Sequence, residues 1–259
     1  MFAVFIMIII GVLTGILTGL TSASGVVIVV PLTNMLLHLS VHHSIGTSLL
    51  VDVIAPLTVA YTYYRFGNID ISSGFWIGLG TVTGAQTGSY FSSLIPDFGL
   101  GLFFAVTLFI SGILILKGGI NVEKRIKISQ EKGKMTFKDI SWAVILGFLI
   151  GIITGLLGAG GGIMIFLVLV FVLKYDIRKA LGTSALIMVI TSISGAIGYG
   201  IRGFVDYKIG LIIGIIAAVT GSFGAVIANK VEENTLKNIV GSTYIFLSLL
   251  MITVKYVFS

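Results

Sequence analysis

The sequence predicts an all-α polytopic membrane protein built from two homologous repeats. Of its 259 residues, 56% are hydrophobic and only 10% are charged, and the mean hydropathy is +1.13. Soluble domains carry about a quarter charged residues, so this composition excludes an ordinary soluble fold. Long apolar runs recur along the chain, and a helix needs about 20 such residues to cross a bilayer. The alternation of apolar and polar residues that is typical of membrane β-barrels is absent.

The duplication is visible when the sequence is aligned with itself so that Gly11 lies over Gly147. Residues 11–25 then match residues 147–161 with nine identities in fifteen positions. The same register, continued without a gap, places the Gly-Thr-Ser of residues 46–48 on that of residues 182–184. One register held over this distance indicates an ancestral repeat. We therefore expect an N-terminal repeat at 1–117, a basic linker at 118–139 and a C-terminal repeat at 140–259.

Each repeat contains five apolar segments, and the second of these is clearly the shortest. This segment follows a break, at residues 22–25 in one repeat and at 158–162 in the other. At about 1.5 Å per residue it is too short to cross a bilayer comfortably. The first two segments of each repeat therefore form either a broken hairpin or a full helix with a short, steep partner, and three transmembrane helices follow. The segments are expected at 2–22, 25–38, 44–66, 71–94 and 99–117, and at 140–158, 161–174, 180–201, 207–228 and 235–257.

The loop charges favour an inverted relation between the two repeats. Basic residues in short loops prefer the cytoplasmic side of the membrane. If each broken pair returns the chain to its starting side, thirteen of the sixteen basic residues face the cytoplasm. If each pair makes one crossing, the repeats run parallel and only eleven do. The inverted arrangement is therefore preferred.

These motifs together resemble the sulfite exporter (TauE/SafE) family, also called the toluene-sulfonate uptake permeases. The resemblance covers essentially the whole chain and rests on the duplicated halves, the basic linker, the glycines of residues 158–162 and the repeated Gly-Thr-Ser. It implies a secondary transporter of small sulfur-containing anions in the cytoplasmic membrane, such as sulfite, sulfonates or sulfoacetate. The first repeat departs from the pattern, because serines replace glycines at residues 22–25.

The breaks before the two short segments are the predicted substrate site. Discontinuous helices in matching places of two repeats indicate a transporter's binding site, because their free N–H groups and positive dipole ends attract an anion. Alternatively, the glycines serve only to let helices pack closely. The predicted ligands are Ser22, Ser24 and Gly25 from the first break, and Gly160, Gly161 and Gly162 from the second.

Two pairs of hydroxyls extend this prediction. Thr47, Ser48, Thr183 and Ser184 are placed in the first turn of the third segments, where they either face the substrate or cap their own helix. Gln86 lies at mid-depth on the fourth segment, where it contacts either the substrate or a neighbouring helix.

Asp52 is the acid that lies well inside an apolar segment. Placing a charge there costs about 2.5 to 3.5 kcal/mol on insertion scales, which makes it a functional candidate. Pro56 removes the N–H that would bond to the Asp52 carbonyl. We expect Asp52 to take up and release a proton during transport; alternatively it is a structural carboxyl bonded to a hydroxyl such as that of Thr58 or Ser48. Its counterpart in the second repeat is Met188.

Asp70 and Asp206 are predicted N-caps of the fourth segments. Tyr61, Tyr63 and Tyr64, with Trp76 and Trp142, are expected in the interfacial aromatic belts.

The predicted function is secondary transport of a small anion by alternating access in the lipid bilayer, coupled to protons through Asp52. An anion channel, or a transporter of other organic anions or metal cations, remains an alternative. No nucleotide-binding loop and no H-E-x-x-H motif is present, so an ATP-driven pump and a zinc hydrolase are not expected. We expect no cofactor, no bound metal and no nucleic-acid partner, and the oligomeric state is not encoded.

Overall fold

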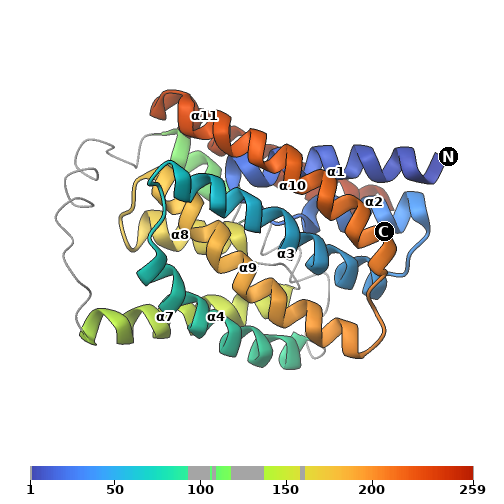
Figure 1. The fold of residues 1–259 in the computed structure, drawn as a ribbon, viewed down its shortest axis with the longest axis horizontal. Coiled ribbons are helices and arrows are strands. Elements are labelled where there is room, and N and C mark those ends of the chain that lie inside the picture. Colours follow the sequence, from blue (N-terminus) through green and yellow to red (C-terminus); the bar gives the residue numbers. More distant parts are fainter. Residues whose placement is uncertain (1, 93–105, 107–108, 118–136, 158–160, 259) are drawn as a thin grey trace.

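The computed structural model describes the chain except for residues 1, 93–105, 107–108, 118–136, 158–160 and 259. All regular structure in this part of the chain is helical, as the sequence predicts. Residues 109–116, which precede the predicted linker, are also helical. The helices shown in Figure 1 are α1 (Phe2–Thr21), α2 (Val26–Leu37), α3 (Val41–Arg65), α4 (Ile71–Ser92), α7 (Phe137–Leu157), α8 (Gly162–Phe171), α9 (Ile177–Ile201), α10 (Tyr207–Lys230) and α11 (Glu233–Phe258).

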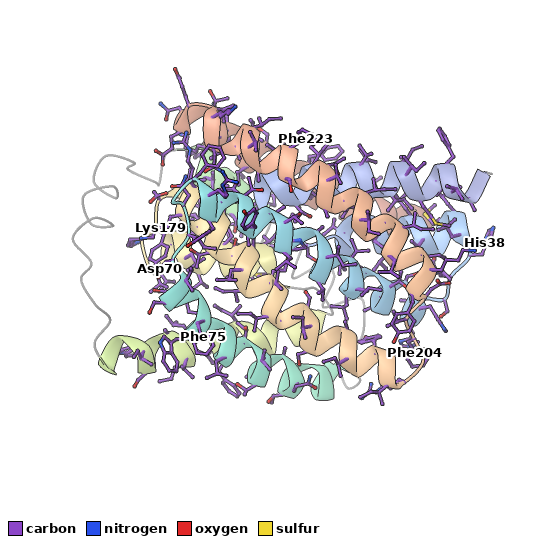
Figure 2. The ribbon with its side chains drawn as sticks, viewed as in Figure 1. His38, Asp70, Phe75, Lys179, Phe204 and Phe223 are labelled. Atoms are coloured by element: carbon purple, nitrogen blue, oxygen red, sulfur yellow. The ribbon has the colours of Figure 1, made fainter. Side chains whose placement is uncertain are left out.

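Four of these helices are long and apolar enough to cross a bilayer, and they confirm the prediction of a polytopic membrane protein. They are Ala3–Thr21, Val41–Arg65, Ile177–Ile201 and Tyr207–Lys230. On α10, apolar side chains at every fourth position are exposed, and Phe223 lies on the outer side of that helix (Figure 2). A fully apolar outer stripe is what a helix facing lipid requires. The stripe consists of Leu211, Ile215, Val219, Phe223 and Ile227.

The two short helices follow the predicted breaks. α2 has 12 residues and α8 has 10 residues, so each is a half-helix. The backbone leaves the helical region at Ser22, with φ 51°, and at Gly161, with φ 80°. Each break therefore frees the first N–H groups of a new helix from intrahelical bonds.

The helices of the two halves interlock. α1 packs along α10, and its counterpart α7 packs along α4. The central helices α3 and α9 contact each other, and each also contacts the α10 or α4 of the opposite half. α1 begins at the end of the bundle marked N, whereas α7 begins at the opposite end (Figure 1). The inversion of the repeats stays a prediction, which this arrangement favours.

Two close approaches of the backbone recur at equivalent positions of the two repeats. A Cβ on Gly46 would lie 2.1 Å from the carbonyl oxygen of Phe204, and a Cβ on Gly182 would lie 2.1 Å from that of Asn68. No larger residue fits at either position without moving the opposite loop. The repeated Gly-Thr-Ser motif thus begins with a glycine because the loop of the other half lies against it.

Three helices, α3, α7 and α9, begin three residues earlier than the sequence predicts. α7 begins at Phe137, inside the range assigned to the linker; the rest of that range, 118–136, lies outside the described residues. α3 and α9 begin three residues earlier than predicted, because Ser40 and Asp176 cap them by accepting from the backbone N–H groups of His43 and Lys179.

The prediction of an aromatic belt is wrong for Tyr63. Its side chain is completely buried and its hydroxyl donates to the Gly19 carbonyl at 3.1 Å. Tyr61, Tyr64 and Trp142 are exposed.

Candidate functional site

The two breaks meet inside the bundle. A Cβ on Gly162, at the start of α8, would lie 2.2 Å from the carbonyl oxygen of Ser22. The Ser22 hydroxyl donates to the Leu181 carbonyl of α9 at 2.7 Å. The first break therefore contacts both α8 and α9 of the second half. Ser22 and Gly162, which were predicted as ligands from opposite halves, lie together.

At the first break, the carboxylate of Asp52 occupies the N-terminus of α2. The Gly25 N–H donates to Asp52 Oδ1 at 2.7 Å, and the Ser24 hydroxyl donates to Oδ2. Asp52 is 1% exposed. Free N–H groups at the start of a helix form an anion site, and here the anion is a side chain of the protein itself. Sequence reasoning identified Ser24, Gly25 and Asp52 separately and did not connect them.

Neither Thr58 nor Ser48, the hydroxyls predicted as partners of a structural Asp52, bonds to its carboxylate. The Thr58 hydroxyl donates to the carbonyls of Ala55 and Ala218, each at 2.9 Å. Ser48 lies one turn before Asp52 on α3, and its buried hydroxyl has no hydrogen-bond partner among the described residues. The hydroxyl that binds the carboxylate belongs to Ser24 instead.

A second buried hydroxyl beside the first break is also without a partner. Thr14 of α1 is completely buried, and its Oγ1 makes no hydrogen bond to any residue that the structure describes. The position that a Cβ on Gly25 would take lies 2.9 Å from both Thr14 Cγ2 and Asp52 Oδ1. Leaving such a group unsatisfied costs about 1 to 3 kcal/mol, so unpartnered hydroxyls at one place indicate a function there.

The second break has a different chemistry. Met188 stands where the first half has Asp52, and its sulfur lies 2.6 Å from the position of a Cβ on Gly162. A thioether carries no charge, so it cannot neutralise the helix dipole as a carboxylate does. The N-cap residue of α8 is Gly161, which has no side chain that could cap the helix. Gly160 lies outside the described residues.

The threonines of the two Gly-Thr-Ser motifs join the halves. The Thr47 hydroxyl accepts from the backbone N–H of Asp206, and the Thr183 hydroxyl accepts from that of Asp70, both at 3.0 Å. Because α3 and α9 start earlier than predicted, these residues lie in the second turn and do not cap their own helices. The capping alternative is therefore wrong for both, and their role as substrate ligands stays a prediction.

Two further predicted ligands have partners within the protein. The Ser184 hydroxyl donates to the Leu181 carbonyl at 3.0 Å. Gln86 Nε2 donates to the Ser194 hydroxyl at 2.6 Å, which links α4 to α9. The expected contact between helices is thus present for Gln86, and its contact with substrate stays a prediction.

The two N-cap predictions are confirmed. Asp70 accepts from the Ser73 N–H at 3.0 Å, and Asp206 accepts from the Ile209 N–H at 2.9 Å. Asp70 also accepts from the Tyr175 hydroxyl at 2.7 Å and lies near Lys179 (Figure 2). This network joins the start of α4 to the loop before α9.

The histidines lie at the other end of the bundle. The rings of His42 and His43 contact Phe204, with centroids 5.4 Å apart in each case. Within the described ranges, no three His, Cys, Asp or Glu residues are arranged to hold a metal ion.

Comparison with known proteins supports the resemblance seen in the sequence. The profile of the family described as Sulfite exporter TauE/SafE matches residues 7–251. No solved structure matches the chain.

Three curated relatives are similar along most of their length. "Probable membrane transporter protein YdhB" of Bacillus subtilis (strain 168) is 32% identical over 231 residues, which cover 89% of this chain and 92% of the relative. "Probable membrane transporter protein YunE" of the same organism is 23% identical over 250 residues, covering 89% and 90%. "Probable membrane transporter protein MJ0441" of Methanocaldococcus jannaschii is 27% identical over 225 residues, covering 82% and 79%.

Proposed function

Because the chain belongs to the sulfite exporter TauE/SafE family of membrane transporters, we propose that it moves small sulfur-containing anions across the membrane by alternating access. The chain is a transporter and not an enzyme. The proposed substrates are of the sulfite, sulfonate or sulfoacetate type. Substrate binds between the N-termini of α2 and α8, and the two halves alternately expose it to each side.

The observation that carries this proposal is the carboxylate at the start of α2. The Gly25 N–H and the Ser24 hydroxyl bind the two oxygens of Asp52. This terminus therefore accommodates a group in which two oxygens share a negative charge. A sulfite or sulfonate group presents three oxygens of the same kind. The N-terminus of α8 lies in contact with the same break through Ser22.

The surroundings of the second terminus suit an anion with a small organic part. Apolar atoms of Thr154, Ile165 and Met188 lie beside Gly161 and Gly162. The oxygens of a sulfonate would face the N–H groups, while its carbon would contact these apolar atoms. Charged and apolar contacts on opposite sides of a ligand fix its orientation.

We also propose that Asp52 is the proton-coupling residue. It lies within a membrane-spanning helix and is 1% exposed, where a permanent charge is costly. Uptake of a proton removes that cost in one step of the cycle.

A ligand-stability screen of the purified protein tests the substrate class. The unfolding temperature is measured with sulfite, sulfate, thiosulfate, sulfoacetate, taurine, carboxylates of the same size and divalent cations. A specific ligand at about 100 times its dissociation constant stabilises by about 2.7 kcal/mol. We expect sulfur oxyanions to raise the unfolding temperature in a saturable way. If only carboxylates or divalent cations do so, the assignment to sulfur anions is wrong.

Transport in proteoliposomes tests the mechanism. We expect saturable uptake of the stabilising anion and counterflow, in which internal unlabelled anion drives the entry of labelled anion. Single-channel currents without counterflow would instead identify an anion channel.

A further inference from the structure

The carboxylate of Asp52 and a transported oxyanion require the same hydrogen-bond donors. Oδ1 accepts from the Gly25 N–H and Oδ2 accepts from the Ser24 hydroxyl, so each oxygen has its own donor. A sulfonate at the start of α2 would use these two groups in the same way. Two anions cannot share them, because like charges at this distance repel strongly and the donors are already used.

We propose that Asp52 is an internal competitor of the transported anion, and that its protonation opens the N-terminus of α2 to substrate. This inference rests on the proposed function and specifies how proton and anion are linked. The ionised side chain closes the first half of the site. A protonated side chain is a poor acceptor, and it releases the Gly25 N–H and the Ser24 hydroxyl to the substrate. One proton then enters the site with each anion.

The structure contains acceptors for the protonated side chain. A carboxylic acid carries an O–H donor that needs an acceptor when it is buried. Thr14 has its methyl carbon 2.9 Å from the position of a Cβ on Gly25, and Ser48 lies one turn before Asp52. Within the described part of the chain, neither hydroxyl has a hydrogen-bond partner. Both are completely buried. While Asp52 bonds to α2, neither hydroxyl has a partner among the residues that the structure describes, and either can accept a hydrogen bond from the O–H of the acid when Asp52 turns away.

Few other groups near Asp52 can account for a pH dependence. α1 and α2 contain no ionisable side chain. On α3, α9 and α10, most ionisable side chains lie in the first or last turns. Those side chains are His42, His43, Tyr61, Tyr64 and Arg65 on α3, Arg178, Lys179 and Tyr199 on α9, and Tyr207, Lys208 and Lys230 on α10.

The phenols nearest the first break have their own partners. Tyr63 of α3 donates to the Gly19 carbonyl, and Tyr244 of α11 donates to the Thr21 carbonyl, each at 3.1 Å. Neither is bonded to the carboxylate of Asp52.

The second half provides an internal comparison. Met188 replaces Asp52 there, so the N-terminus of α8 has no competing carboxylate from the corresponding position. Proton control is thus expected at α2 alone. Substrate binding at the α2 terminus therefore depends on pH through Asp52. The N–H groups of the α8 terminus are available to substrate at every pH.

Binding of methanesulfonate to the purified protein between pH 5 and 9 tests the proposal. This probe keeps a single charge over the whole range, unlike sulfite. We expect its affinity for the wild-type protein to fall by about tenfold per pH unit once Asp52 is ionised, as one linked proton requires. Asp52→Asn should bind with the same affinity at every pH, close to the low-pH limit of the wild type. Tyr61→Phe, at an exposed position of the same helix, is the control and should keep the wild-type slope.

Proton uptake gives a second readout that needs no folded variant. In weakly buffered solution with a pH dye, the wild type should take up close to one proton per methanesulfonate bound at a pH where Asp52 is ionised. Binding without proton uptake, or an unchanged slope in Asp52→Asn, overturns the competition and leaves the anion assignment standing. No binding of methanesulfonate at any pH overturns the competition together with the proposed sulfonate substrates. Binding that requires Na⁺, tested against choline, would place a cation at Asp52 and also contradict the proposal.

Discussion

The hydroxyl of Thr183 accepts a hydrogen bond from the backbone N–H of Asp70 at 3.0 Å, which joins α9 to the loop before α4. The bond between Thr47 and Asp206 is its counterpart in the repeat, and it has the same length. Each threonine thus binds the loop of the opposite half at the start of α4 or α10. The two bonds belong to the same interface as the close approaches of Gly46 and Gly182.

Replacing Thr183 by Val should destabilise the protein by about 1 to 3 kcal/mol, because it leaves the N–H of Asp70 without a partner. Thr183→Ser keeps the hydroxyl and should be close to wild type. Unfolding in detergent, followed by tryptophan fluorescence, measures the difference. Equal stability of Thr183→Val and wild type would show that the bond contributes nothing. A loss of anion binding in the folded variant would support the additional role of Thr183 as a ligand.

Replacing Gly162 by Ala should impair both stability and anion binding. The new Cβ would lie 2.2 Å from the Ser22 carbonyl oxygen and 2.6 Å from the Met188 sulfur, so the two breaks must separate. Forced overpacking of this kind costs about 1 to 3 kcal/mol. The matched control is Gly198→Ala on α9, because no described atom beyond its chain neighbours and its own helix backbone lies within 4 Å of the new Cβ. If both variants unfold at the wild-type temperature, the two breaks do not touch as described.

Acidic pH should lower the free energy of unfolding, because Asp70 becomes protonated. Burial raises the pKa of this carboxyl, but hydrogen bonds from Ser73 and Tyr175 outweigh burial, and Lys179 adds to their effect. The pKa of Asp70 is therefore below its ordinary value of 3.8. A lowered pKa means that the ionised form stabilises the fold above that value, and that this stability is lost as the pH falls through the folded-state pKa.

The unfolding temperature should consequently decrease below about pH 3.8, and less steeply in Asp70→Asn than in the wild type. Tyr175→Phe removes one of the bonds to the carboxylate and should give an intermediate slope. Parallel curves for the wild type and Asp70→Asn would exclude a contribution from this group.

Much of the fold follows from local features of the sequence. The breaks, the short helices and the caps at Asp70 and Asp206 depend on neighbouring residues, so composition and spacing predict them. The repeat also indicated which positions are equivalent, such as Asp52 and Met188. The early starts of α3 and α9 depend on the N-caps Ser40 and Asp176, which lie outside the apolar segments and are not predicted from them.

The contacts within the site could not be predicted in the same way. Whether Asp52 bonds to Ser24 or to Ser48 depends on how α3 is rotated against α2, and spacing along one helix does not determine that rotation. The bonds of Thr47 and Thr183 cross between halves, over 159 and 113 residues of sequence. Such pairing results from packing of the whole bundle, which a single sequence does not encode locally.

Tyr63 provides the last test, because it is buried whereas the neighbouring tyrosines of α3, Tyr61 and Tyr64, are exposed. Its hydroxyl is buried and donates to the Gly19 carbonyl just before the first break, whereas Tyr61 is 59% exposed. Tyr63→Phe removes the bond without opening a cavity and should cost about 1 kcal/mol of stability. Tyr61→Phe should leave stability unchanged. Because the bond holds the end of α1, Tyr63→Phe should also speed hydrogen exchange at residues 19–25, measured by mass spectrometry, and equal exchange in the two variants would contradict this role.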